Sequence, residues 1–305
     1  MQILSTIIPI FSVIFFGWLA ARRGFVPPQF AGPANRLVFY FAIPAMVFSA
    51  IAKGSLKTDF NPAVLGCTLA AVGLSFGVTW VLGRIWQVPH RRFGTFVQSA
   101  FHGNLGYIGL AVAFYHLGEA GFISASLIIG FVMILQNLLS VMILQIYNDT
   151  DSAVNGMKKV LSKILGNPVI VSAVAGIFFS LTGLGLPIMV SRTLDIISGM
   201  ALPLALLLIG AALNFDRMKS QLVRVLPSTI IKLVLVPAAG FLLYTLWGLS
   251  PDLYLPGLIL LASPSATIIY VMAVEMNGDV EFAVTAISVS TLLSAVSFSA
   301  WLHIT

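Results

Sequence analysis

The sequence predicts an all-α membrane protein with ten transmembrane helices, arranged as two inverted five-helix repeats with broken, crossing helices in spans 4 and 9. Composition is the first observation behind this fold class. The chain has 305 residues, of which 59% are hydrophobic and only 9% are charged, and its mean hydropathy is +1.02. So few charges could not cover the surface of a soluble protein of this length. Long apolar runs separated by short basic loops are typical of membrane-spanning helices.

An internal repeat is the second observation, and it appears when the chain is shifted by 159 or 160 residues. A shift of 159 pairs Pro9 with Pro168, Gly17 with Gly176, Gly24 with Gly183, Pro28 with Pro187, and Pro44 with Pro203. A shift of 160 pairs Gly118 with Gly278 and Phe122 with Phe282. Glycine and proline constrain backbone shape, so the two halves are expected to follow one backbone course. In a very hydrophobic chain such repeats are typical of secondary transporters.

Ten apolar runs are long enough to be spans. They are Ile3–Ala21, Arg36–Ala52, Ala63–Trp86, Phe93–Leu117, Phe122–Tyr147, Pro168–Leu186, Thr193–Leu213, Leu222–Trp247, Tyr254–Met276 and Phe282–Ile304. The first run lacks a basic leader and a cleavage site, so it is interpreted as a span and not as a signal peptide. Residues 1–147 form the first repeat, 148–167 a cytoplasmic linker and 168–305 the second repeat. Because five spans is an odd number, the second repeat enters the membrane from the opposite side.

Basic residues set the direction of the spans. The odd-numbered loops hold twelve of them: Arg22, Arg23, Arg36, Arg84, Arg91, Arg92, Lys158, Lys159, Lys163, Arg217, Lys219 and Arg224. The even-numbered loops hold three, Lys53, Lys57 and Arg192. This asymmetry predicts odd loops in the cytoplasm and both termini outside. It also accounts for the net charge of +6, so that charge gives no support to nucleic-acid binding.

Two spans are expected to be interrupted in the middle. Span 4 carries Gly103, Gly106 and Gly109, which weaken a helix, and Asn104, whose side chain can bind freed backbone groups. Span 9 carries Pro264 between Ser263 and Ser265, and proline removes a helical hydrogen bond. Each break alone has a simpler explanation, close packing for the glycines and a kink for the proline. Their matching positions in the repeat favour a substrate path, because polar backbone at mid-membrane is tolerated only beside a cavity.

Crossing breaks predict an anion site. The N-termini of two half-helices would point at the centre of the membrane, with partial positive charge and free N–H donors that suit a carboxylate. The expected substrate-binding residues are Gly103, Asn104, Gly106, Tyr107, Gln136, Asn137, Ser263, Pro264, Ser265 and Thr267. Gln136 and Asn137 could instead join helices, and Tyr107 could simply pack. Pro44 and Pro203 are expected to kink spans 2 and 7.

Three ionisable residues are candidates for ion coupling or gating. His102 adjoins the break in span 4 and could carry a proton. Lys232 lies within span 8, where a charge indicates function by default, although its long side chain could also snorkel to the interface. Glu275 ends span 9 and could equally face water. No cofactor and no metal site is expected, and coupling to H⁺ or Na⁺ is left open.

At these residues the chain resembles the auxin efflux carrier family, which includes the plant PIN proteins and bacterial permeases for small organic acids. The resemblance rests on Gly17 with Arg23-Gly24, Asn104-x4-Gly109, Asn167-Pro168 and Ser263-Pro264, in that order. It implies a fold similar to the bile acid–sodium symporters, with spans 1, 2, 6 and 7 as a scaffold and spans 3–5 and 8–10 as a transport domain. It also implies elevator-type transport of malate, malonate or auxin-like acids, and a homodimer formed through the scaffold.

The chain departs from the plant pattern in three places. The linker is about twenty residues, Gly103 stands where the plant proteins have a proline, and span 3 has no acidic residue. These differences favour a bacterial organic-acid carrier in the inner membrane over an auxin carrier.

Other function classes fit less well. A uniporter or channel of the same fold is the near alternative, and a sodium-coupled, bile-acid-like symporter is a weaker one. The sequence has no His-rich metal pattern, no paired acidic motif within a span and no Gly-x-Ser-x-Gly elbow, so an enzyme is not expected. The phosphate-binding motif of ATP-driven pumps is also missing from the sequence. Cys67 is the single cysteine, so disulfides within the chain are excluded.

Overall fold

The computed structural model describes residues 2–54, 59–147 and 166–305, and almost all of this part of the chain is helical. The first half contains α1 (Gln2–Arg22), α2 (Pro28–Leu37), α3 (Ile43–Lys53), α5 (Pro62–Ile85), α6 (His90–Phe101) and α7 (Leu110–Ile146). The second half contains α9 (Pro168–Leu181), α10 (Ile188–Ser198), α11 (Ala201–Ala211), α12 (Phe215–Ile230), α13 (Val236–Leu246), α14 (Pro251–Ala262), α15 (Ile268–Glu275) and α16 (Val280–Ile304). Three π-helical segments are η1 (Val38–Ala42), η2 (Leu105–Gly109) and η3 (Ile231–Leu235).

Proline and asparagine start several of these helices. Asn61 and Asn167 immediately precede Pro62 and Pro168, and each accepts hydrogen bonds from the two N–H groups that follow the proline, at 2.9–3.3 Å. Proline at the first helical position costs no hydrogen bond, because the N–H of any residue there has no acceptor within the helix. The expected start of span 2 at Arg36 was wrong, because α2 already begins at Pro28, where proline favours the first turn of a helix.

Seven helices in the described part of the chain are long and apolar enough to cross a membrane. The expected spans 4 and 5 merge in this count because Leu105–Ile146 runs on through a kink at Gly118, where φ is 69°. Spans 6 and 9 are too short, since α9 has 14 residues and α14 has 12. At 1.5 Å per residue, 14 residues reach about 21 Å, less than the apolar thickness of a bilayer. The predicted linker 148–167 lies mostly outside the described residues.

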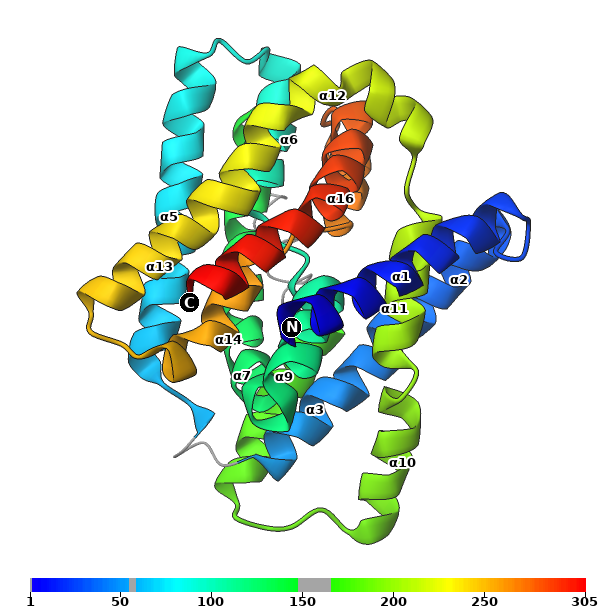
Figure 1. Cartoon of the computed structure of the whole chain (residues 1–305), viewed down its shortest axis with the longest axis vertical. Coiled ribbons are helices and arrows are strands. Elements are labelled where there is room, and N and C mark those ends of the chain that lie inside the picture. The colour runs from blue at the N-terminus through cyan, green and yellow to red at the C-terminus, as the bar shows by residue number, and fades with distance from the viewer. Residues whose placement is uncertain (1, 55–58, 148–165) are drawn as a thin grey trace.

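Close helix pairs form the lower and right parts of the molecule in Figure 1, where α1 crosses α11 and α3 packs beside α9. Gly17 and Gly210 leave no room for a side chain, because a Cβ at either would meet the backbone of the other helix, at Leu207 and at Ile14. A Cβ at Gly176 would lie 3.0 Å from Ile51 and 3.3 Å from the carbonyl of Phe48. Small residues allow such close approach of membrane helices.

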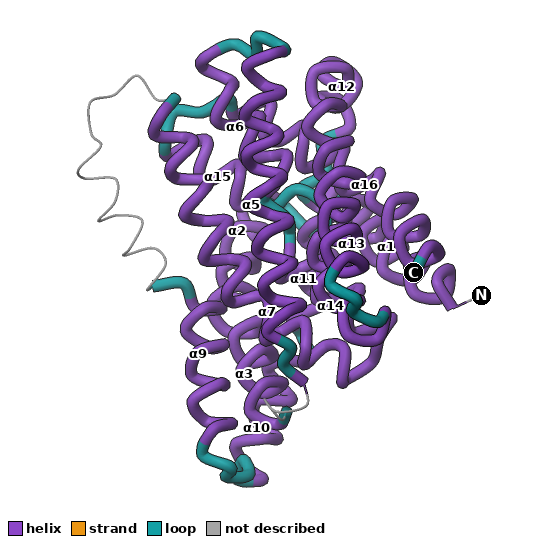
Figure 2. The backbone as a smooth tube through the Cα atoms, turned by 90° about the vertical axis from the view of Figure 1, so that its left-hand side faces the viewer, coloured by secondary structure: helices purple, strands orange, loops and turns teal. Residues whose placement is uncertain are grey.

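Helices α12 and α16 pack together, as do α5 with α13 and α14 with α7. Figure 2 shows loops at the two ends of the long axis and along its sides, and non-helical backbone inside the bundle. Prolines distort spans 2 and 7 as predicted, since η1 directly precedes Ile43-Pro44, and Gly199-Met200 separates α10 from Pro203 in α11.

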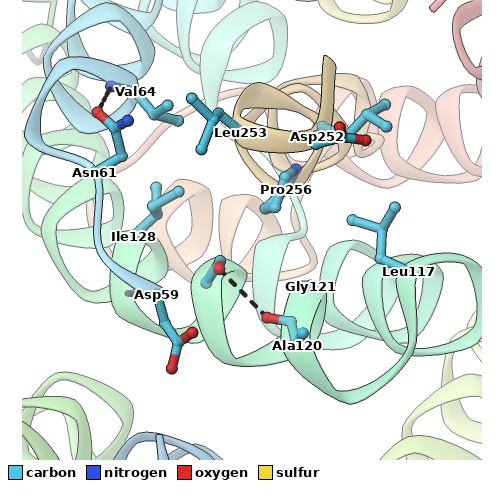
Figure 3. Close-up of a pocket in the computed structure, with 12 residues that line it drawn as sticks. Asp59, Asn61, Val64, Leu117, Ala120, Gly121, Ile128, Asp252, Leu253 and Pro256 are labelled. Carbon is cyan, nitrogen blue, oxygen red and sulfur yellow. Dashed lines mark hydrogen bonds between the residues drawn. The ribbon is translucent and has the colours of Figure 1, made fainter. Parts of the chain in front are cut away.

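Cavities lie at the two ends of α5. One has a volume of about 330 Å³ and adjoins the starts of α5 and α14 and the kink in α7 (Figure 3). Its lining includes Asp59, Asn61, Leu117, Ser124, Asp252 and Pro256. The other, about 360 Å³, is lined by residues that include Arg84, His90, Phe93 and Tyr147. Both cavities lie away from the residues that the sequence marks as the substrate site.

Candidate functional site

The first break lies between α6 and α7. Helix α6 ends at Phe101, His102 has φ −81° and ψ 100°, and Asn104 has φ −78° and ψ 68°. The helix restarts at Leu105 with the wide turn of η2, which contains Gly106 and Gly109. Glycine stabilises a helix poorly, so this sequence tolerates both the interruption and the irregular turn that follows it.

The second break lies between α14 and α15. Helix α14 ends at Ala262, Ser263 is extended with ψ 144°, and the next helix begins only at Ile268. Pro264 cannot donate a hydrogen bond and its ring clashes with the preceding turn, so α14 cannot continue through it.

The two breaks bind one another. The Asn104 N–H donates to the Pro264 carbonyl at 2.7 Å, and the Ala266 N–H donates to the His102 carbonyl at 3.0 Å. Gly103 and Ser265 form an antiparallel β-bridge. Backbone groups freed inside an apolar environment need partners, and each break supplies them for the other. The structure thus brings together the glycine and serine–proline segments that the sequence marked as one site.

Side chains hold the ends of the two half-helices. At the end of α6, the Ser265 hydroxyl donates to the Ser99 carbonyl at 2.7 Å and Gln136 Nε2 donates to the Phe101 carbonyl at 3.2 Å. At the end of α14, the Ser263 hydroxyl donates to the Leu260 carbonyl at 2.6 Å and Lys232 Nζ donates to the Leu261 carbonyl at 2.7 Å. The last carbonyls of a helix have no intrahelical donor, so these four bonds replace the missing ones.

Three buried side chains at the crossing are incompletely bonded within the described part of the chain: Ser99 at Oγ, Gln136 at Oε1 and Asn104 at Nδ2. Asn104 is the one of them whose unpaired atom can only donate. The residue is 5% exposed, and its Nδ2 has no hydrogen-bond partner among the described residues. An unpaired buried amide is costly, so an acceptor from outside the described chain would account for it.

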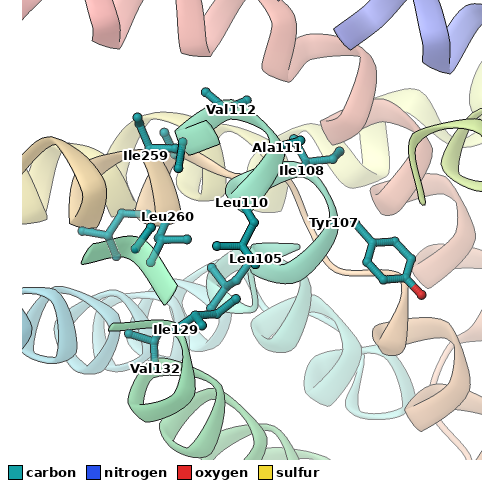
Figure 4. Close-up of a cluster of buried hydrophobic side chains, with 14 of the residues drawn as sticks. Leu105, Tyr107, Ile108, Leu110, Ala111, Val112, Ile129, Val132, Ile259 and Leu260 are labelled. Atoms are coloured by element: carbon teal, nitrogen blue, oxygen red, sulfur yellow. The ribbon is translucent and has the colours of Figure 1, made fainter. Parts of the chain in front are cut away.

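Tyr107 points away from the apolar cluster around Leu105, Leu110 and Leu260, as Figure 4 shows. Its hydroxyl donates to Asn35 Oδ1 of α2 at 2.6 Å. Gly106 and Thr267, on either side of the crossing, are partly exposed, whereas Ser263, Pro264 and Ser265 are buried. Solvent therefore reaches the crossing at Gly106 and at Thr267.

The remaining predicted residues fall in different places. His102 is buried and its Nδ1 lies 2.8 Å from the Ser140 hydroxyl. Asn137 follows Gln136 on α7 and is partly exposed. Glu275 is exposed at the far end of α15, about 12 Å of helix from the crossing, so it lies outside the site. The snorkelling alternative for Lys232 is wrong, since this side chain is fully buried and binds Leu261.

Sequence reasoning missed several polar partners of the crossing. Asn35, Ser99 and Ser140 are examples, and Ser290 accepts a hydrogen bond from the Ser265 N–H at 3.1 Å. The one available signal was the run of buried hydroxyls on α16, which includes Ser288, Ser290, Thr291 and Ser294. Hydroxyls are common in membrane helices, so that signal did not single out Ser290.

Comparison with known proteins places the chain among transporters. A protein of Rhizobium meliloti (strain 1021) named "Putative malonate transporter" is 26% identical over 319 residues, covering 99% of this chain and 96% of the relative. An "Uncharacterized transporter" of Methanothermobacter thermautotrophicus is 24% identical, covering 97% of this chain and 96% of the relative. The "Uncharacterized transporter YfdV" of Escherichia coli (strain K12) is 22% identical, covering 99% and 97%. Residues 2–302 match the family described as membrane transport protein, in agreement with the resemblance to auxin efflux carriers, and the chain belongs to this family.

Proposed function

We propose that this protein is a secondary transporter of a small carboxylate anion of the malonate type, which binds where the two breaks cross. The observation that carries the proposal is the buried Asn104 amide, whose Nδ2 lacks an acceptor in the described part of the protein. A carboxylate oxygen would supply that acceptor. The Rhizobium relative is named "Putative malonate transporter", so malonate is the first substrate to test.

Backbone donors complete the proposed site. The first N–H groups of a helix have no partner within it, and here they belong to Gly106 and Tyr107 at η2 and to Thr267 and Ile268 at α15. Both half-helix starts adjoin the crossing and carry partial positive charge. Together with Asn104 they suit a carboxylate better than a cation or a neutral solute.

Two inverted repeats and ten spans belong to the same proposal. Residues with positive φ support the repeat. The described residues of this kind are Gly24, Gln87, Gly118, Gly183, Gly248 and Asn277. They form three pairs, Gly24 with Gly183 (159 apart), Gln87 with Gly248 (161 apart) and Gly118 with Asn277 (159 apart). The chain therefore turns in the same way at corresponding points of both halves.

Helix packing supports the proposed scaffold. Gly17 contacts Leu207 across α1 and α11, and Gly176 contacts Phe48 across α9 and α3. Gly176 lies 159 residues after Gly17, and Leu207 lies 159 residues after Phe48. The contact in one half of the chain therefore has its equivalent in the other half. Spans 1, 2, 6 and 7 would form the scaffold, through which the proposed homodimer would also form. Spans 3–5 and 8–10 would form the moving domain. The basic loops favour an orientation with both termini outside. The departures from the plant pattern and the bacterial relatives favour a bacterial inner membrane.

Uncoupled transport is a second candidate mechanism. Among the side chains that the structure describes, buried Asp and Glu are absent, and Lys232 is the one buried Lys or Arg. Coupling to H⁺ or Na⁺ in membranes commonly uses acidic side chains. Net uptake that is insensitive to Na⁺ and to a proton gradient would favour this candidate.

Counterflow in proteoliposomes tests the function. Vesicles loaded with malonate should take up labelled malonate, with malate and pyruvate as competitors. Asn104→Ala should reduce exchange about 10-fold or more, because a hydrogen bond to a charged group contributes about 1.5–3 kcal/mol. Gln145→Ala removes an amide elsewhere on α7 and serves as the control. Normal exchange by folded Asn104→Ala protein would refute the site, and no exchange of any carboxylate by the wild type would refute the substrate class.

A further inference from the structure

Lys232 has an unusual position for a charged residue. It is 0% exposed and lies near the middle of the candidate span Gln221–Leu246, within the π-helical segment η3. It is the one buried Lys, Arg, Asp or Glu among the described side chains. A charge in this place is costly, and short π-helical segments often occur at functional sites.

Its side chain reaches the crossing of the two breaks. Nζ donates to the carbonyl of Leu261 at 2.7 Å, and Leu261 is the last residue but one of α14. A Cβ on Gly103 would lie 3.3 Å from Lys232 Cε, so the lysine stem packs against the residue that precedes Asn104. The ammonium therefore lies at the negative end of one half-helix and directly behind the other break.

Capping alone does not explain a lysine here. The carbonyl at the corresponding position of the first break is that of Phe101, 160 residues before Leu261, and it accepts its hydrogen bond from the neutral amide of Gln136 at 3.2 Å. Both carbonyls are thus satisfied, one by an amide and one by an ammonium. What Lys232 offers at the second, and Gln136 does not offer at the first, is a group that can carry a positive charge.

We propose that Lys232 is the fixed counter-charge of the anion site and determines its preference for the charge of the ligand. It acts through the field at the crossing, as a specificity-determining residue that does not touch the ligand. The inference rests on the proposed function, which makes the ligand a carboxylate. The ammonium of Lys232 neutralises one carboxylate of a bound ligand. The site with a bound monoanion is then neutral without a co-transported cation, whereas the site with a bound dianion keeps one negative charge.

Gly103 is what allows this arrangement. Any side chain at residue 103 would also meet Ser263 Oγ, at 2.7 Å from its Cβ, and would separate the lysine from the Asn104 backbone. Because Lys232, Ser263 and Asn104 are buried, a unit charge several ångströms away changes anion affinity about 10-fold or more per charge.

The test compares three ligands of one shape and different charge, at a pH above the second ionisation of malonate. These are malonate (two negative charges), malonamate (one) and malonamide (none), titrated at constant ionic strength while thermal unfolding of the purified protein in detergent is followed. Ligands that bind the folded state raise the unfolding temperature in proportion to their affinity and concentration. Wild-type protein should bind the three in the order of their charge, with about 10-fold between neighbours.

Lys232→Gln is the decisive variant, because glutamine already holds the equivalent carbonyl and keeps a donor for Leu261. It should reduce the difference between neighbouring ligands from about 10-fold to about threefold, because Asn104 and the half-helix starts still favour a carboxylate. Lys232→Arg should keep the wild-type order. Ser297→Ala is the control: it removes a hydrogen bond to the Leu233 carbonyl, next to Lys232 in η3, and should keep the wild-type differences between the ligands.

Three results would overturn the proposal: wild-type protein that ignores ligand charge, Lys232→Gln protein that keeps the wild-type 10-fold differences, or Ser297→Ala protein that loses them. Should Lys232→Gln fail to fold, Lys232→Met is measured in its place with the same expectation. The measurement uses binding and not flux. A failure of transport would therefore remove the proposed function, while charge-dependent binding through Lys232 would still be seen.

Discussion

The replacement of Gly103 by alanine tests the packing of the crossing most directly. A Cβ at this position would lie 2.7 Å from Ser263 Oγ, 3.1 Å from Leu105 Cδ2 and 3.3 Å from Lys232 Cε. All three neighbours are buried. Ser263 Oγ cannot turn aside freely, because it donates to the Leu260 carbonyl at 2.6 Å.

The expected cost follows from these contacts. Loss of the Ser263 hydrogen bond costs about 1 kcal/mol, and overpacking of a buried site costs about 1–3 kcal/mol. Gly103→Ala should therefore reduce the free energy of unfolding by about 2–4 kcal/mol. For a chain of this length that corresponds to a fall in the unfolding temperature of about 5–10 °C.

Gly106→Ala is the matched control. Gly106 lies three residues further along the same break, and a Cβ there would meet nothing within 4 Å. Alanine in helical backbone is more favourable than glycine by about 0.5–1 kcal/mol, so this variant should be as stable as wild type or slightly more stable. Thermal unfolding in one detergent, followed by tryptophan fluorescence, compares the three proteins. Equal stability of Gly103→Ala and wild type, or equal losses in both variants, would refute the described packing.

Three further predictions concern contacts outside the breaks. Gly17→Ala should destabilise the α1–α11 crossing by about 1–3 kcal/mol, whereas Gly32→Ala, where a Cβ meets nothing within 4 Å, should not; unchanged thermal stability of Gly17→Ala would contradict the crossing. Tyr107→Phe should reduce the free energy of unfolding by about 1 kcal/mol, because Asn35 Oδ1 loses its donor. A double-mutant cycle with Asn35→Ala should give a coupling energy of that size, and a coupling energy of zero would exclude the hydrogen bond. Asp279→Ala should cost about 1–2 kcal/mol through the N-cap of α16 and the 3.0 Å ion pair with α6, and Asp279→Ser, which keeps a cap, should lose less.

Local backbone chemistry made the breaks predictable from the sequence. Gly103 and Pro264 act on the residues beside them, so the positions where α6 and α14 end could be inferred without knowledge of the fold. The repeat then placed the two breaks together, because matching positions of related halves are expected to meet. Gly118 lies between the expected spans 4 and 5, and the structure has there a kink with positive φ within a continuous helix.

Long-range partners could not be predicted in the same way. Lys232 was recognised as unusual, yet its bond to Leu261 depends on how η3 approaches α14, which no local pattern encodes. Asn35 gave no signal, because a single asparagine near a helix end is ordinary, and its bond to Tyr107 joins residues 72 positions apart. The expected end of span 6 at Leu186 was wrong, since α9 ends at Leu181 after 14 residues.

The hydrogen bonds around the crossing bear on how the protein could move. These bonds join the side chains of five residues to partners on α6, α7, α14 and α16; the five are His102, Gln136, Lys232, Ser263 and Ser265. These helices belong to the proposed moving domain, as does η3, which carries Lys232. Tyr107 is the exception, because its partner Asn35 lies on α2 of the proposed scaffold. A rigid displacement of the moving domain would therefore keep both breaks, their caps and the lysine charge together, and would exchange one side-chain hydrogen bond beside the site. A mechanism in which the breaks themselves open would break at least two backbone hydrogen bonds inside the membrane, Asn104 to Pro264 and Ala266 to His102. Because a rigid displacement keeps both bonds, the structure favours the elevator-type movement proposed for this chain.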